Sequence, residues 1–397
     1  MRQQLRVAVV ITRFIAGAGG VALRGALAVD PQRYAITVMS ADEGPLLAQA
    51  EEAGLSVVRL RHMNPEIRPL EDRWALNEIA VELAGGNFDL VHTHSTKAGA
   101  LGRMAAHRVG VPAVVHTFHG FPFHDFQSAP RRRMYIEAER RLGRITDQFV
   151  AVGAAVAAQA VCLKIARPDR ICTIASAIEP CISPVTPAAR RRARRLFGLS
   201  EEERVVGTVG RLDFQKAPLD LIKAIASLPQ SGVYGVWVGD GPGRPEVERF
   251  LERHGLTGRF LLLGERRDVA DLLPGFDVFA MSSLYEGLPC ALAEAMTCGI
   301  PVVATAVNAV PELVAPGKTG ILAPPGDPGA LAQGLGYLLD HPAEAALMAA
   351  AGRQLVGDRF HPEHLGRDLD RIYQSALGHA LPSHDKPTPR LEGSRAS

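Results

Sequence analysis

The stretch FDVFAMSSLYEGLPCALAE, residues 276–294, has the pattern of a buried strand followed by a loop and a helix. Residues 276–281 form an almost unbroken apolar run, as expected for a strand covered on both faces of a parallel sheet. Pro289 suits the first turn of a helix, where its missing N–H is not needed. This order places the carboxylate of Glu286 in the loop and that of Glu294 about one turn inside the helix.

The start of that helix is a candidate binding site for an anion. N–H groups at Gly287, Leu288 and Cys290 are expected to be free and to lie at the positive end of the helix dipole. An anion is stabilised at that end, and the flanking carboxylates suit the hydroxyl groups of a polyol. A sugar joined to a phosphate would satisfy both demands, whereas two solvated glutamates at a helix border are the alternative.

The same alternation of strands and helices runs through the whole chain of 397 residues. The strand patterns of the first half lie at 6–12, 34–40, 56–60, 90–93, 113–117, 148–152 and 171–174. Those of the second half lie at 205–209, 233–238, 260–263, 278–281, 301–305 and 320–322. Strands that alternate with helices predict an α/β fold, with two Rossmann-like, doubly wound domains that face each other across a cleft.

The prolines of residues 179–187 predict the linker between the two domains. We expect domains at 1–185 and 186–360, a terminal helix at 361–380 that could pack back on the first domain, and a disordered tail at 381–397. The ligand should bind at the carboxyl ends of the strands in the cleft.

Composition limits the classes of function. The formal net charge of +2 gives no argument for nucleic acid, and the five cysteines, odd in number and without C-x-x-C spacing, indicate a reduced, cytoplasmic protein. We expect neither a secretory signal nor a membrane-spanning helix. Two arginine clusters, at 131–144 and 190–195, suit an anionic membrane surface; solvated helix faces are an equal alternative.

Basic and glycine-rich loops follow several predicted strands. Arg211 and Lys216 come directly after the first strand of the second domain, where two cations could neutralise a departing diphosphate without a metal. Gly19 and Gly20 follow the first strand of the chain, where a glycine loop allows backbone N–H groups to approach a phosphate. The alternatives are solvated loop cations and an ordinary tight turn.

Histidines are dense in the first half of the chain, and His119 falls just past a strand end, where contact with a ligand is favoured. His92 and His94 share one face of a strand, but they lack the further ligands of a zinc site. Asp368 and Asp370 do not share a helix face, and we interpret them as solvated surface.

These motifs are similar to those of the retaining glycosyltransferases of family four, which have the two-domain GT-B architecture. The resemblance extends from the glycine loop to about residue 325 and is most specific in Glu286-Gly287-Leu288-Pro289 through Glu294 and in residues 295–304. Residues 210–216 and 239–242 strengthen it. Residues 91–99 and 116–122 resemble members that build bacterial surface polysaccharides.

The resemblance implies a metal-independent, retaining hexosyltransferase. Its donor would be a nucleotide sugar such as a UDP- or GDP-sugar, with no other cofactor, and its acceptor a glycan or a polyprenyl-linked glycan at the inner face of the cell membrane. The first domain would bind the acceptor and the second the donor. The implied catalytic residues are Glu286, His119, Arg211 and Lys216, and the implied donor contacts are Gly19, Gly20, Arg211, Lys216, Glu265, Arg266, Arg267, Glu286, Gly287, Leu288 and Glu294.

Two other functions fit the same architecture. A nucleotide-sugar epimerase or hydrolase would need no sugar acceptor. A non-catalytic nucleotide-sugar-binding subunit would need no catalytic residues, and the presence of Arg211, Lys216, Glu286 and Glu294 counts against it.

Overall fold

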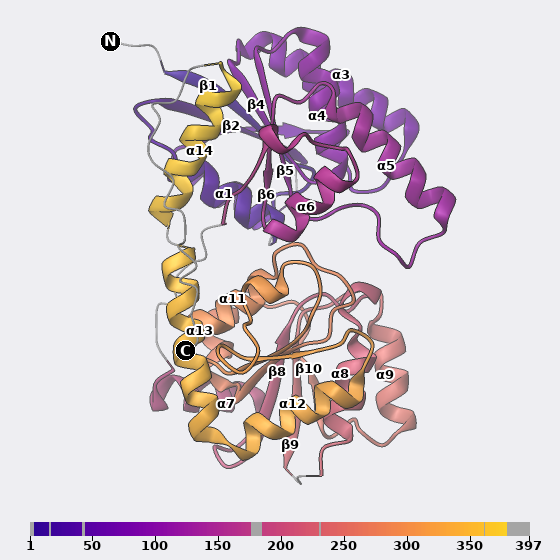
Figure 1. Cartoon of the computed structure of the whole chain (residues 1–397), viewed down its shortest axis with the longest axis vertical. Helices are drawn as coiled ribbons and strands as arrows, with labels where there is room; N and C mark the ends of the chain where they lie inside the picture. The colour runs from indigo at the N-terminus through magenta and orange to yellow at the C-terminus, as the bar shows by residue number, and fades with distance from the viewer. Residues whose placement is uncertain are drawn as a thin grey trace, which may run out of the picture.

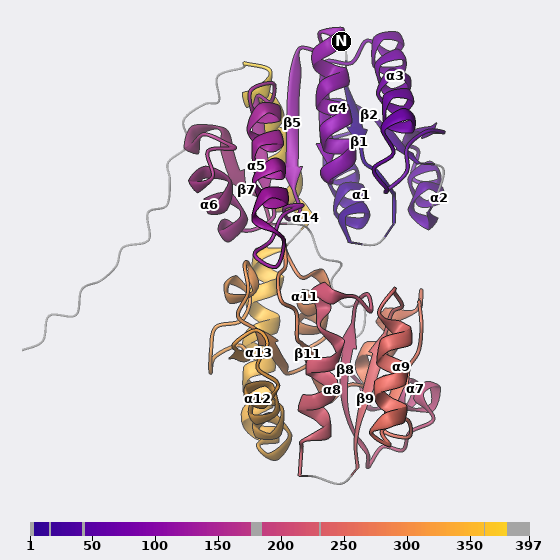
Figure 2. The same cartoon turned by 90° about the vertical axis from the view of Figure 1, so that its right-hand side faces the viewer.

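The computed structural model describes residues 4–15, 17–41, 44–175, 185–229, 232–360 and 362–378. Within them the chain forms two parallel sheets, each covered by helices on both faces (Figures 1 and 2). The α/β fold class and the thirteen predicted strands are therefore confirmed, each strand within two residues of its predicted ends. The tail and residues 176–184 lie outside the described part, so the predicted division at residue 185 remains a prediction.

The first sheet has seven strands in the order β3-β2-β1-β4-β5-β6-β7. Its strands are β1 (Leu5–Val10), β2 (Tyr34–Ala41), β3 (Ser56–Leu60), β4 (Leu90–His94), β5 (Ala113–Phe118), β6 (Gln148–Ala151) and β7 (Ile171–Thr173). The helices are α1 (Ala18–Ala28), α2 (Pro45–Glu52), α3 (Pro69–Gly86), α4 (Thr96–Val109), α5 (Ala129–Gly143), α6 (Ala154–Cys162) and the 3₁₀ turn η1 (Pro168–Arg170).

The second sheet has six strands in the order β10-β9-β8-β11-β12-β13. Its strands are β8 (Arg204–Val209), β9 (Val233–Val238), β10 (Phe260–Leu262), β11 (Val278–Met281), β12 (Val302–Thr305) and β13 (Ile321–Ala323). The helices and 3₁₀ turns are α7 (Pro187–Phe197), η2 (Phe214–Lys216), α8 (Pro218–Ala226), α9 (Arg244–Arg253), α10 (Val269–Leu272), η3 (Leu273–Gly275), α11 (Cys290–Thr297), η4 (Val310–Glu312), α12 (Pro328–Asp340) and α13 (Pro342–Arg359).

Continuous apolar runs form these strands because both faces of each sheet are buried. In β1, Val7 and Val9 point into one hydrophobic cluster while Ala8 and Val10 point into another on the opposite face. In β11, Phe279 and Val278 divide in the same way between the two clusters of the second sheet. Alternate residues of a strand point to opposite faces, so a strand with helices on both sides must be apolar throughout.

The strand order places one switch point in each sheet. The chain moves outward from β1 to β3 and then returns to the other side of β1 with β4, and β8 and β11 have the same relation. Loops that follow the two strands at such a point diverge, which leaves a crevice for a ligand at the carboxyl ends. Residues 210–216 and 282–289 are the loops at the switch point of the second sheet.

The last helix, α14 (Pro362–Ala376), packs against α1, β5 and β6 of the first domain, whereas α13 packs against α11 and α12 of the second (Figure 1, yellow). Asp370 of α14 accepts a hydrogen bond from the Tyr34 hydroxyl at 2.6 Å and forms an ion pair with Arg33 at 2.7 Å. The interpretation of Asp370 as solvated surface is thus wrong, because it anchors the helix to β2.

Glu312 of the second domain contacts the start of α6 in the first domain. Its Oε1 accepts a hydrogen bond from the N–H of Ala155, at the start of α6, at 3.0 Å, and its Oε2 lies 2.6 Å from Arg359. Burial alone would raise the pKa of Glu312, but the hydrogen bonds from Arg359 and the α6 N–H groups hold it below its ordinary value. An ionised carboxylate at a helix start is stabilised by the helix dipole, so this contact fixes α6 against the second domain.

Candidate active site

The loop after β8 presents two cations at the switch point. Asp213 caps the η2 turn by accepting the Lys216 N–H at 3.1 Å, and it also pairs with the Arg211 guanidinium at 2.8 Å. The Arg211 side chain is 71% exposed, whereas that of Lys216 is only 19% exposed. Lys216 is therefore enclosed by its neighbours, and Arg211 presents its guanidinium to solvent.

Lys216 and Glu286 form one ionic pair. Their Nζ and Oε1 atoms are 2.5 Å apart, and the Glu286 side chain is 5% exposed. Ser283 donates a hydrogen bond to the same oxygen at 2.6 Å, and Gln215 donates to Oε2 at 3.4 Å. The structure thus brings together two residues that the sequence pattern had placed separately, on the diphosphate and on the sugar.

The start of α11 is open to an anion. No side chain caps this helix, and Pro289 is its N-cap residue. The N–H of Cys290 donates to the carbonyl of Leu288 at 3.0 Å, so the expectation that it is free is wrong. Over the described part of the chain, the N–H groups of Gly287 and Leu288 have no backbone or side-chain acceptor, as an anion site at a helix start requires.

Charged groups from both domains act on the Cys290 thiol. Burial, followed by the carboxylate of Glu294, raises the pKa of this thiol to about 11, and Glu286 acts in the same direction. Arg24 and Lys216 act in the opposite direction. The first residue of α11 is therefore within the electrostatic reach of both glutamates and of a cation from each domain.

The first domain meets this site at His119. A Cβ added to Gly287 would lie 1.6 Å from the carbonyl oxygen of His119, so only a glycine allows the two chains to approach this closely. The His119 ring lies 3.0 Å from His94, between Nε2 and Nδ1. His92 is tied in turn to Thr117 at 2.7 Å and to Tyr373 of α14 at 2.9 Å.

The histidines of this group are neutral at neutral pH. Burial lowers the pKa of His92 to about 3 and that of His119 to about 4, and it lowers the pKa of His94 and His116 well below the ordinary value. In the His94–His119 hydrogen bond one ring donates its N–H and the other accepts. His119 can therefore donate or accept one hydrogen bond toward a ligand, but it does not carry a positive charge at neutral pH.

Acid should destabilise the first domain because of these histidines. An unfolded histidine takes up a proton below about pH 6.5, while His92 in the folded state stays neutral until pH falls to about 3. Stability is thus full above pH 6.5 and falls by up to about 1.4 kcal/mol per pH unit for each such group below it. Thermal melting of His92→Gln from pH 7 to pH 4.5 should show a shallower decline than the wild type; an equal decline would contradict this assignment.

The glycine loop is shaped by packing as well as by any ligand. A Cβ on Gly19 would lie 3.1 Å from the carbonyl carbon of Phe14 and 3.3 Å from Leu46. A Cβ on Gly20 would lie 3.2 Å from the Arg24 guanidinium. Both glycines stand at the start of α1, whose N-terminus has no side-chain cap, so the donor contacts expected of them remain predictions.

The charged loop after β10 lies beside the glycine turn after β9. Gly239 and Gly264 form a β-bridge, with the Gly239 N–H donating to the Gly264 carbonyl at 2.8 Å. Arg266 pairs with Asp268 at 2.5 Å, and both side chains are 37% exposed. Glu265, Arg266 and Arg267 therefore lie at the sheet edge away from β11, and their contact with a nucleotide base stays a prediction.

An aromatic contact between the domains was not predicted from the sequence. The rings of His124 and Tyr285 stack with centroids 4.4 Å apart, and Phe126 and Phe214 meet edge to face at 5.4 Å. Phe126 and Phe214 are 56% and 59% exposed. The only available signal was the density of aromatic residues at 118–126, which does not show where their partners lie.

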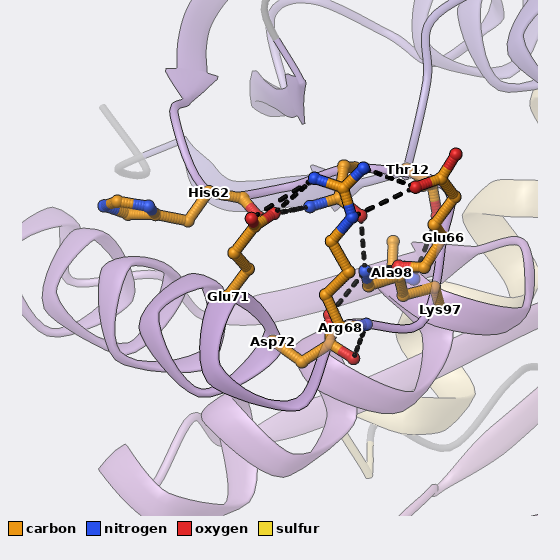
Figure 3. Close-up of polar contacts among 9 residues, drawn as sticks. Thr12, His62, Glu66, Arg68, Glu71, Asp72, Lys97 and Ala98 are labelled. Atoms are coloured by element: carbon orange, nitrogen blue, oxygen red, sulfur yellow. Dashed lines mark hydrogen bonds and ion pairs between the residues drawn. The ribbon is translucent and has the colours of Figure 1, made fainter.

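Figure 3 shows a polar cluster at the carboxyl edge of the first sheet. The Lys97 ammonium contacts Asp72, the Glu66 carbonyl and, at 3.0 Å, Asn64. The Arg68 guanidinium lies between the carboxylates of Glu66 at 2.5 Å and Glu71 at 3.2 Å. These pairs neutralise one another and fix the loop after β3 to the start of α4.

The two arginine clusters have different environments. In α7, Arg190 and Arg194 pair with Asp277 at 2.7 and 2.5 Å, and Arg192 pairs with Asp271 at 2.7 Å. Arg191, Arg192 and Arg195 of that cluster are exposed, and its contact with a membrane remains a prediction. In α5, Arg131 and Arg133 are exposed, and Arg131 lies over the Tyr135 ring at 5.8 Å.

Three further findings concern the described residues alone. No group of three or more histidine, cysteine, aspartate or glutamate side chains there could hold a metal ion, and no helix there is long and apolar enough to cross a membrane. Cys162, Cys172 and Cys290 are free thiols, but Cys298 is disulfide-bonded, so the expectation that all cysteines are reduced is wrong for Cys298.

Family models match both halves of the chain. Residues 15–180 match "Glycosyltransferase Family 4", and residues 203–341 match "Glycosyl transferases group 1". The D-inositol 3-phosphate glycosyltransferase of Mycolicibacterium smegmatis is 30% identical over 79% of this chain and 73% of its own length. The UDP-Gal:alpha-D-GlcNAc-diphosphoundecaprenol alpha-1,3-galactosyltransferase of Escherichia coli is 29% identical over 70% of this chain and 73% of its own length.

Solved structures share the fold. The crystal structure of Anabaena HepE in complex with UDP and glucose superposes with a TM-score of 0.81 at 21% identity, covering 94% of this chain and 100% of that one. The glycosyltransferase WaaG, involved in lipopolysaccharide biosynthesis, gives a TM-score of 0.73 at 19% identity, covering 93% of this chain and 99% of that one. At these identities the likeness concerns the fold alone.

Proposed function

The chain belongs to glycosyltransferase family 4, and we propose that it transfers a hexosyl group from a nucleoside diphosphate sugar with retention of anomeric configuration and without a metal ion. The observation that carries the proposal is the site between β8 and β11. Lys216, Arg211 and the uncapped start of α11 converge there, with the carboxylates of Glu286 and Glu294 beside them. Cations and helix N–H groups stabilise a leaving diphosphate, and carboxylates bind sugar hydroxyls.

Each group has a separate role in the proposed reaction. Arg211 and Lys216 hold the diphosphate, Glu294 binds the ribose hydroxyls, and the Gly287 and Leu288 N–H groups with Glu286 bind the donor sugar. The bond from the anomeric carbon to the diphosphate oxygen breaks, and the acceptor hydroxyl attacks from the same face. Its proton passes to an oxygen of the leaving diphosphate. Glu286 is buried beside Lys216. In the reaction the Glu286 carboxylate can stabilise positive charge on the sugar, while the Lys216 ammonium stabilises negative charge on the leaving phosphate.

His119 contributes as a neutral side chain. Its low pKa, caused by burial, excludes a role as a cationic acid at neutral pH. With His94 on Nε2, the ring can offer its other nitrogen to a sugar hydroxyl from the first domain. The base of the donor would contact Glu265, Arg266 and Arg267. The phosphates of the donor would lie beside Gly19 and Gly20.

A lipid-linked glycan is the proposed acceptor. The Escherichia coli relative is named for a UDP-galactose donor and a diphosphoundecaprenol acceptor, which supports a UDP-sugar and a polyprenyl-linked acceptor here. Thermal shift with UDP-, GDP- and ADP-sugars in EDTA identifies the donor, because a ligand that binds the folded state raises the melting temperature. The configuration of the new bond then follows from NMR of the product. Inversion, or activity only after a metal ion is added, would overturn the corresponding part of the proposal.

The donor incubated alone separates transfer from the other reactions. A labelled nucleotide sugar should stay intact without acceptor and be consumed when a membrane lipid extract is added. Epimerised donor, or rapid hydrolysis without acceptor, would instead identify an epimerase or hydrolase of the same architecture.

The exposed start of α5 is the proposed contact with an anionic membrane. Arg131 and Arg133 are exposed there beside Met134, which is 57% exposed. Near an anionic surface each such charge is worth about 1 kcal/mol. The Arg131→Ala/Arg133→Ala variant should lose co-sedimentation with phosphatidylglycerol vesicles, while Arg191→Ala in α7 should keep it. Equal binding of both variants, or no binding by the wild type, would reject the α5 surface.

A further inference from the structure

Arg24 lies in α1, one helical turn after Gly20. Side chains of a helix lean toward its N-terminus, and the Arg24 guanidinium lies over Gly20, with Nη1 only 3.2 Å from the position that a Cβ there would occupy. A side chain at residue 20 would press on the guanidinium, which would have to shift by a few tenths of an ångström. The glycine thus gives room for Arg24 at the start of α1.

Arg24 has no partner for its charge in the described part of the chain. Its Nε is buried and makes no hydrogen bond, and the side chain forms no ion pair there. Arg103 and Arg194 are more deeply buried, and each guanidinium pairs with a carboxylate, Arg103 with Glu139 at 2.9 Å and Arg194 with Asp277 at 2.5 Å. The Nε of Arg132 is also buried without a hydrogen bond, but its guanidinium lies 3.5 Å from Asp125. A buried donor without an acceptor is costly, and in native proteins it commonly indicates a ligand or water.

The opposite wall of the site is the start of α11. Cys290 is its first residue, and the groups whose charges reach that thiol are Glu294, Arg24, Glu286 and Lys216. Arg24 lies on α1, which is at the edge of the first domain that faces α11 (Figures 1 and 2), and its charge acts on the Cys290 thiol. The close approach of His119 to Gly287 brings the two domains together at the same place.

We infer that Arg24 binds the distal phosphate of the donor, as a cation supplied by the first domain opposite Lys216. The inference rests on the proposed function. An arginine fork can donate two parallel hydrogen bonds to phosphate oxygens, and one of them would give the unbonded Nε an acceptor. The leaving diphosphate would then be held from both domains, so that donor binding draws the glycine loop of α1 toward α11.

The test compares UDP with UMP, which lacks the distal phosphate, by isothermal titration calorimetry. Arg24→Ala should weaken UDP binding roughly tenfold to a hundredfold, as expected for loss of a charge-assisted hydrogen bond, and leave UMP binding within about twofold of the wild type. Arg24→Lys should recover part of the loss. Arg108→Ala is the matched control, because Arg108 lies on α4 and bonds Asn77 at 2.8 Å. Circular dichroism melting verifies that each variant is folded.

The outcomes separate this inference from the proposed function. If Arg211→Ala weakens UDP binding and Arg24→Ala does not, the role of Arg24 is wrong and the proposed function stands. If Arg24→Ala weakens UMP as much as UDP, the contact is not with the distal phosphate, which also contradicts the inference. If folded wild-type protein binds none of UDP, GDP and ADP, the proposed function itself fails; if GDP or ADP binds in place of UDP, the same comparison is made with the corresponding monophosphate.

Discussion

The Lys216→Ala variant is expected to lose about 10²–10³-fold in kcat, the usual cost of removing one preorganised group that stabilises charge in a transition state. Lys216 lies 2.5 Å from Glu286 and is only 19% exposed, and Arg211 is paired with Asp213 at 2.8 Å, so neither water nor Arg211 replaces the ammonium at the same place. Initial rates of nucleoside diphosphate release, measured with donor and acceptor, give the result.

Controls separate lost catalysis from lost stability. Lys216→Ala leaves the Glu286 carboxylate buried without its cation, which destabilises the fold by an amount that Lys216→Met/Glu286→Gln should largely recover. That double variant should melt near the wild type and remain inactive. Lys223→Ala, an exposed lysine in the last turn of α8, should have normal rates. Near-normal turnover by folded Lys216→Ala would remove Lys216 from the reaction.

The Gly287→Ala variant is expected to lose more than about a hundredfold in kcat/KM while both domains stay folded. The new Cβ would lie 1.6 Å from the His119 carbonyl oxygen and 2.7 Å from its carbon, a clash that backbone atoms can relieve only by moving apart. Misplacing reacting groups by about 1 Å can cost on the order of a hundredfold in rate. Small-angle scattering should also show a larger radius of gyration for the variant.

Gly258→Ala is the matched control, because a Cβ at Gly258 has no neighbour within 4 Å. It should have normal activity and scattering. If Gly287→Ala were fully active with an unchanged radius, His119 and Gly287 could not be in contact in the working enzyme, and the placement of His119 beside the donor sugar would be lost.

The strands could be predicted from the sequence because burial of both sheet faces requires apolar side chains at consecutive positions. The apolar run of β11 and the alternation of β1 between two clusters are visible in consecutive residues. The position of Glu294 within α11 followed from Pro289 for the same reason. Local patterns of this kind need no knowledge of distant parts of the chain.

The pairings inside the site could not be predicted in that way. Lys216 and Glu286 are 70 residues apart and meet only because β8 and β11 are neighbours at the switch point. The α7 arginines resembled a free basic surface because their partner Asp277 lies in another part of the chain. Asp370 resembled solvated surface because Tyr34, its partner, is 336 residues away. In each case the missing information was a contact between distant segments.

We propose that the carboxyl edge of the second sheet holds a nucleoside diphosphate at Arg211, Lys216 and the start of α11. Calorimetric titration of UDP, GDP and ADP in EDTA, against wild type and Arg211→Ala, tests it most directly. We predict that at least one of the three binds the wild type, and that Arg211→Ala binds it at least about tenfold more weakly, as loss of a charged hydrogen bond requires. Failure of all three to bind folded wild type, or equal binding by Arg211→Ala, would contradict the claim.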